Sequence, residues 1–240
     1  MLNVIAAIVL GNVISVLGAA LLLLASDKQQ ERLMPWLLSF ATGTLLCTGF
    51  VGMLPKALNQ VAPVYGMLTL LAGILVFFLL EKTLLWRHCH KKDCTLHSAA
   101  GSIIIIGDSV HNFMDGIAIA VAFSASAPLG IATAIAVFAH ELPQEVGDFA
   151  ILLSAGFSKK SAFFWNIVSG MAALLGGLAA WWAVDSFRVV VPYALAFAAA
   201  SMIYVAMSDL IPSLRMPGKT GAAHFFALVA GIVVMLRFIL

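Results

Sequence analysis

Charged residues are scarce in this chain of 240 residues. Only 10% of the residues are Asp, Glu, Lys or Arg, whereas 62% are hydrophobic. A soluble globular protein carries roughly 25% charged residues, because it must cover a surface as well as fill a core. The shortage of charge argues against a soluble domain. It predicts an all-α integral membrane protein in which residues 1–240 form a single transmembrane domain.

Two other shortages exclude further classes of protein. The net charge of +2 is too small to predict binding to nucleic acid. The three cysteines, Cys47, Cys89 and Cys94, are too few for a disulfide framework. We therefore expect a protein that is surrounded by the lipid bilayer and has no organic cofactor.

Long apolar runs, by contrast, are abundant. About 20 apolar residues in a helix cross the roughly 30 Å of bilayer hydrocarbon, and an open sheet is excluded there because its backbone groups would lack partners. Eight runs are long enough, and the breaks between them are polar or contain proline and glycine. The expected spans are residues 3–25, 35–55, 64–86, 99–124, 128–154, 161–183, 190–212 and 221–239.

Basic residues gather at alternate breaks and so predict the orientation of the chain. Ten lie at the breaks that follow spans 1, 3, 5 and 7, and three lie on the other side. An excess of Lys and Arg marks the cytoplasmic side, so we expect both termini outside the cytoplasm. The ten are Lys28, Arg32, Lys82, Arg87, Lys91, Lys92, Lys159, Lys160, Arg215 and Lys219, and the three are Lys56, Arg188 and Arg237.

Two similar segments suggest an internal repeat. Span 2 ends in "MLPKAL" (53–58) and span 7 ends in "LIPSL" (210–214), on opposite sides of the membrane. We therefore expect a 3+2+3 arrangement, in which spans 1–3 and 6–8 form an inverted repeat around spans 4 and 5, as in many secondary transporters.

Five of the eleven acidic residues lie inside spans 4 and 5, which contain no Lys or Arg. A charge at the bilayer centre costs about 2.5–3.5 kcal/mol on insertion scales, so five unpaired carboxylates would cost on the order of 10 kcal/mol. A proton or a metal cation is the remaining counter-charge. The five are Asp108, Asp115, Glu141, Glu145 and Asp148.

The spacing of these residues favours a metal. His111 and Asp115 are four residues apart and so share one helix face, as do His140 and Gln144. Both histidines lie about halfway along their spans, and Pro143 frees a backbone carbonyl nearby. Imidazole nitrogen with carboxylate oxygen suits zinc, iron, manganese or cadmium.

Other interpretations of the same residues remain open. Buried histidine and carboxylate pairs also form structural hydrogen bonds and proton relays, and a membrane protein can sense a metal without moving it. The segment "HELPQ" (140–144) is one residue short of the H-E-x-x-H motif of metalloproteases, because Gln144 replaces the second histidine. We therefore do not expect an enzyme.

The motifs "HNFMDG" (111–116) and "HELPQEVGDFAIL" (140–152) resemble those of the ZIP (Zrt/Irt-like) family of metal transporters. "EKTLLWRHCH" (81–90) and "SDLIP" (208–212) resemble bacterial members, which implies a bacterial inner (plasma) membrane. The resemblance implies eight helices, both termini outside, and a metal site between spans 4 and 5 that is often binuclear. It also implies movement of the metal, zinc above all, into the cytoplasm.

The resemblance also implies the ligands. Two residues, Glu145 and Asp148, would orient ligands or relay protons, and Asp108 and Asp209 would line the path. Gln144, Thr48, Gly52, Ser213 and Arg215 depart from the residues usual in the family, which bears on affinity and on the choice of metal. The implied ligands are His111, Asn112, Asp115, His140, Glu141 and Gln144.

The break "RHCHKKDCTLH" (87–97) offers a second group of donors. On the cytoplasmic side its thiols stay reduced, so thiolate and imidazole could hold zinc, although Lys91 and Lys92 also fit a solvated loop that only sets the topology. A homodimer is compatible with a bundle of this size. The donors of this loop are His88, Cys89, His90, Cys94 and His97.

Overall fold

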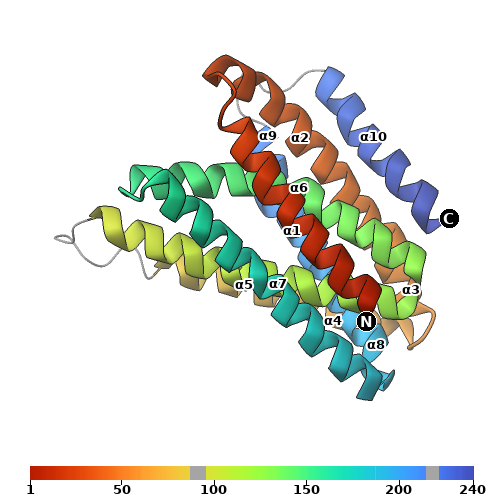
Figure 1. The fold of residues 1–240 in the computed structure, drawn as a ribbon. Coiled ribbons are helices and arrows are strands. Elements are labelled where there is room, and N and C mark those ends of the chain that lie inside the picture. The colour runs from red at the N-terminus through yellow and green to blue at the C-terminus, as the bar shows by residue number, and fades with distance from the viewer. Residues whose placement is uncertain (87–95, 187, 215–221) are drawn as a thin grey trace.

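The structure is a computed structural model that describes residues 1–86, 96–186, 188–214 and 222–240 (Figure 1). Within these ranges it consists of helices and short turns, without a strand. The helices are α1 (Leu2–Leu22), α2 (Asp27–Cys47), η1 (Thr48–Met53), α3 (Leu54–Leu58), α4 (Pro63–Trp86), α5 (Leu96–Ala125), α6 (Ala127–Ser154), α7 (Lys159–Ser186), η2 (Arg188–Val190), α8 (Val191–Val205), η3 (Ala206–Leu210), α9 (Ile211–Leu214) and α10 (Ala222–Ile239).

Each of the eight expected spans corresponds to one helix or to a short series of helices. Among the described residues, six helical stretches are long and apolar enough to cross a membrane, and α10 contributes a shorter apolar helix. Helix α6 is not one of the six, because residues 140–148 make its second half polar. The all-helical prediction is thus confirmed, and the helix with the most polar residues is the one that deviates from an ordinary span.

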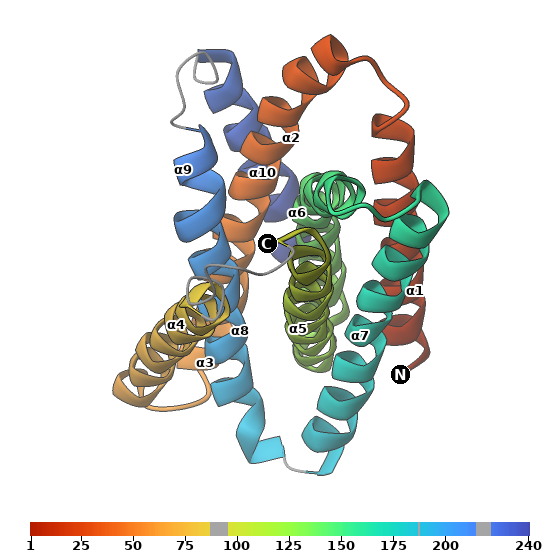
Figure 2. The same cartoon turned by 90° about the vertical axis from the view of Figure 1, so that its left-hand side faces the viewer.

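Helices α5 and α6 lie at the centre of the bundle (Figure 2). Helix α5 packs against α7 and α8, and α6 packs against α1 and α2. In the outer layer α2 contacts α10, and α4 contacts α8. Both helices that carry the acidic motifs are therefore enclosed by other helices.

Glycines bring α5 and α7 into close contact. A Cβ atom on Gly116 would lie 1.8 Å from the carbonyl oxygen of Ala173, and one on Gly176 would lie 2.0 Å from that of Phe113. Any larger residue at either position would push the two helices apart. Such backbone contact through small residues is common between membrane helices, and here it fixes the position of α5.

Polarity is inverted relative to a soluble protein. Large apolar side chains such as Leu10, Ile14 and Leu17 of α1 are exposed, whereas Asp115 and Glu145 are 3% and 1% exposed. Lipid tails suit such an exterior, and the buried carboxylates need compensation from within the bundle.

Spans 2 and 7 share an unexpected irregularity. Each contains a π-helix, η1 or η3, and each continues into a short α-helix with proline at its second residue, Pro55 or Pro212. From the sequence we predicted that these helices end near the proline. Instead, the helix widens into a π-helix and then continues through the proline as a short α-helix. Both chain ends lie at the same end of the bundle (Figure 1).

Candidate metal site

Two histidines from neighbouring helices meet at the centre of the bundle. Nε2 of His111 on α5 lies 3.0 Å from Nε2 of His140 on α6. Nδ1 of His140 lies 3.1 Å from the carbonyl oxygen of Ala136, which can only accept, so Nδ1 carries the proton. In its neutral form, His140 then directs the lone pair of Nε2 toward His111, in the tautomer that a metal requires.

Two carboxylates complete this group. Oδ2 of Asp115 lies 3.5 Å from Nε2 of His111 and 3.3 Å from Nε2 of His140. Oε1 of Glu141 lies 3.6 Å and 3.9 Å from the same two nitrogens. Both oxygens are buried and receive no hydrogen bond from the described residues. Unpartnered buried carboxylate oxygens are costly unless a cation compensates them.

The spacing of the four donor atoms suits a divalent metal. One donor atom from each of His111, Asp115, His140 and Glu141 lies within 4.8 Å of the others. Zinc bonds of about 2.1 Å give a tetrahedron whose ligand atoms are about 3.4 Å apart. The five distances between donor atoms given above, from 3.0 to 3.9 Å, lie on both sides of this value. A cation could therefore bind all four donors after small side-chain movements.

A second polar cluster adjoins the first through Asp108. Its Oδ1 accepts hydrogen bonds from Nδ2 of Asn112, at 2.9 Å, and from Nε2 of Gln144, at 3.2 Å. Nδ2 of Asn112 also lies 3.2 Å from the backbone oxygen of Asp108. Both amides that sequence analysis named as ligands thus point their nitrogen atoms at Asp108.

Two further acids extend the polar region along α6. Glu145 and Asp148 are buried, and each has one carboxylate oxygen without a hydrogen-bond donor in the described part of the chain. Neither α5 nor α6 contains a Lys or Arg that could neutralise them. The acids that sequence analysis placed around the ligands therefore do lie in the enclosed centre of the bundle.

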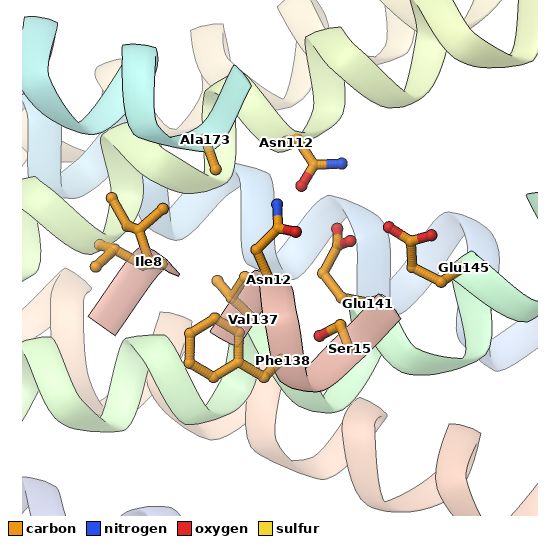
Figure 3. Close-up of a pocket in the computed structure, with 10 residues that line it drawn as sticks. Ile8, Asn12, Ser15, Asn112, Val137, Phe138, Glu141, Glu145 and Ala173 are labelled. Carbon is orange, nitrogen blue, oxygen red and sulfur yellow. The ribbon is translucent and has the colours of Figure 1, made fainter. Parts of the chain in front are cut away.

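Helix α1 forms a wall of the site, which sequence analysis missed. Asn12 and Ser15 line a cavity of about 20 Å³ together with Asn112, Glu141 and Glu145 (Figure 3). This volume is sufficient for one water molecule. Asn12 and Ser15 are three residues apart and lie between the two glycines of α1. Two polar residues in an otherwise apolar span were the signal in the sequence that could have indicated this wall.

Most of the remaining predicted residues cannot be placed relative to this cluster from the described part of the chain. Donors His88, Cys89, His90 and Cys94, like Arg215, lie outside the described residues, and so do the side chains of His97, Asp209 and Ser213. Thr48 is buried in η1. A Cβ on Gly52 would lie 2.7 Å from a methyl group of Leu129, so packing already fills the space of a larger residue there.

Comparison with known proteins shows the family of the chain. The family model of the ZIP zinc transporters matches residues 1–97 and 86–238. The chain belongs to this family. The expected resemblance is thereby confirmed. Because the members of the ZIP family are transporters, the comparison lends no support to the metalloprotease interpretation.

Several similar proteins from animals match this ZIP protein over part of their length. It is 39% identical to human "Zinc transporter ZIP10" over 141 residues, which are 58% of this chain and 17% of the relative. It is 42% identical to Drosophila "Zinc transporter foi" over 126 residues, 51% of this chain and 17% of the relative. With mouse "Zinc transporter ZIP4" the identity is 46% over 112 residues, 47% and 17% of the two chains. The matched part therefore spans about a sixth of each relative's length.

Proposed function

We propose that this ZIP protein transports divalent transition-metal cations across a membrane, with zinc as the main substrate and iron, manganese or cadmium as further candidates. The observation that carries the proposal is the group of four donor atoms from His111, Asp115, His140 and Glu141, enclosed in a bundle with an apolar exterior. Two carboxylates and two neutral imidazoles compensate the charge of a dication fully.

We assign six ligands to the cation path. The four clustered residues bind through Nε2 and carboxylate oxygens, and Asn112 and Gln144 add amide oxygens. Glu145 and Asp148 orient ligands or accept protons as the cation moves along α6, while Asp108 and Asp209 line the path. The neutral amides of Asn112 and Gln144 are weaker ligands than carboxylates, which favours release of the cation.

The helix contacts support a 3+2+3 arrangement with an inverted repeat. If α1 corresponds to α7, α2 to α8, α4 to α10 and α5 to α6, every major contact has a counterpart. The α2–α10 contact matches α8–α4, the α5–α7 contact matches α6–α1, and α2–α6 matches α8–α5. The paired η1 and η3 fit the same relation. Such repeats suit alternating access to a site between them.

The direction of transport in this proposal is into the cytoplasm. The basic residues at alternate breaks support an orientation with both termini outside. The bacterial inner membrane and the homodimer remain predictions from sequence, and the animal relatives add no support for a bacterial type.

Uptake into liposomes tests the proposal. Purified protein is placed in liposomes that contain a zinc-sensitive dye, and zinc is added outside. We expect uptake by the unaltered protein and its loss in His111→Ala and Asp115→Ala, because each removes one of the four clustered donors. Glu31→Gln, an exposed position of α2, is the matched control and keeps its uptake. Unchanged uptake in both site variants would contradict this conduit, whereas zinc binding without uptake would favour a sensor.

A further inference from the structure

One carboxylate oxygen holds two amides from two helices. Oδ1 of Asp108 accepts from Asn112, one turn along the same helix, and from Gln144 on the neighbouring α6. Asp108 is 6% exposed and Asn112 is 5% exposed, so the bond between them is shielded from solvent, whereas Gln144 is half-buried. Hydrogen bonds to an ionised acceptor are about twice as strong as neutral ones.

These bonds decide which atom of each amide faces the cation path. An amide has its oxygen and its nitrogen on opposite sides of the carbonyl carbon, so a nitrogen turned toward Asp108 turns the oxygen away. Figure 3 shows this for Asn112, whose oxygen points into the cavity lined by Glu141 while its nitrogen points away. Without an acceptor at Asp108, the amide could rotate and direct its N–H groups toward the cation, which would repel it.

We propose that Asp108 is a positioning residue that sets the metal preference of the site by orienting the amide oxygens of Asn112 and Gln144. The inference rests on the proposed function, since it assumes that the two amides are ligands. The histidine nitrogens favour zinc, whereas added oxygen ligands favour a harder cation such as Mn²⁺. Asp108 therefore determines how well Mn²⁺ competes with Zn²⁺.

Binding of Zn²⁺ and Mn²⁺ to the purified full chain separates orientation from charge. Asp108→Leu removes the acceptor and the charge, whereas Asp108→Asn removes the charge but keeps an acceptor oxygen of the same shape. We expect Asp108→Leu to weaken Mn²⁺ binding at least tenfold and Zn²⁺ binding much less, since altered support of ligands costs roughly 10- to 100-fold in affinity. In Asp108→Asn, which keeps the acceptor oxygen, we expect the ratio of the Mn²⁺ and Zn²⁺ affinities to stay within about threefold of that of the unaltered protein.

A substitution at Gln144 tests the same bond from its other end. Gln144→Glu has two equivalent oxygens, so either one can face the cation and the side chain needs no orientation by Asp108. In this background we expect Asp108→Leu to weaken Mn²⁺ binding clearly less than it does in the unaltered protein. If Asp108→Leu does not fold, as judged by size-exclusion chromatography, Asp108→Ala replaces it in both backgrounds.

Three outcomes would overturn the inference. The first is equal loss of both metals in Asp108→Leu. The second is an equal change of metal preference in Asp108→Asn and Asp108→Leu. The third is an effect of Asp108→Leu on Mn²⁺ binding that is as large in the Gln144→Glu background as in the unaltered protein. Failure of the proposed function would look different, because the unaltered protein would then bind neither metal or transport neither.

Discussion

Asp115→Asn should make the metal-free protein more stable while it abolishes stabilisation by zinc. Asp115 and Glu141 present buried oxygens within 4.8 Å of each other, and neither receives a hydrogen bond from the described residues. Two ionised carboxylates at that distance repel each other by about 3.5 kcal/mol at an effective dielectric constant of about 20. The new amide removes this repulsion and can donate to Nε2 of His140, where Asp115 has an acceptor 3.3 Å away.

Thermal unfolding in detergent measures both effects. For a chain of this size, 1 kcal/mol corresponds to about 2–4 °C, so the variant with chelator should unfold up to roughly 10 °C above the unaltered protein. Zinc at about 100 times its Kd should stabilise the unaltered protein by about 2.7 kcal/mol and leave the variant unchanged. Glu31→Gln serves as the exposed control. The charge-compensation argument would be refuted if Asp115→Asn with chelator unfolded at a lower temperature than the unaltered protein. It would also be refuted if zinc stabilised both proteins equally.

Two predictions concern the scaffold. Gly116→Val should destabilise the protein by more than about 3 kcal/mol, because its side chain would meet backbone atoms of α7, whereas Gly107→Ala, with open space around it, should stabilise α5 by about 0.5–1 kcal/mol. Thermal unfolding of both variants checks this, and equal effects would show that the α5–α7 contact does not limit stability. Lys56→Met should cost about 1 kcal/mol, since it removes the 2.5 Å hydrogen bond from Lys56 Nζ to Ser126 Oγ at the α5–α6 turn. Hydrogen exchange that leaves this turn as protected as before would contradict it.

The helices were predictable because the bilayer imposes one length on every span. Apolar runs of about 20 residues therefore predicted an all-helical fold, although α2 begins at Asp27 and not at residue 35. The two acidic motifs predicted which helices bring the four clustered donors together. His111 and Asp115 could be paired from their spacing alone, since helix periodicity determines which residues share a face.

Contacts between helices were not predictable in the same way. Periodicity says which face of α1 carries Asn12 and Ser15, but not that α1 packs beside α6 and closes the site. The bond from Gln144 to Asp108 joins residues 36 positions apart, and no local pattern encodes it. The π-helices were not predicted, because a proline indicates that a helix is interrupted but does not indicate whether the helix bends or forms a wider π-turn.

The wide turn of η1 makes span 2 unusually tolerant of a change in length. A π-turn accommodates one residue more than an α-turn, so deleting one residue from 48–53 would regularise the helix instead of breaking it. Because the extra residue is held within the wide turn, the part beyond the deletion would stay on the same face of the helix. Lys56 would still reach Ser126, and the α5–α6 turn would keep its tether. The same deletion in a regular α-helix would rotate everything beyond it by about 100° around the helix axis.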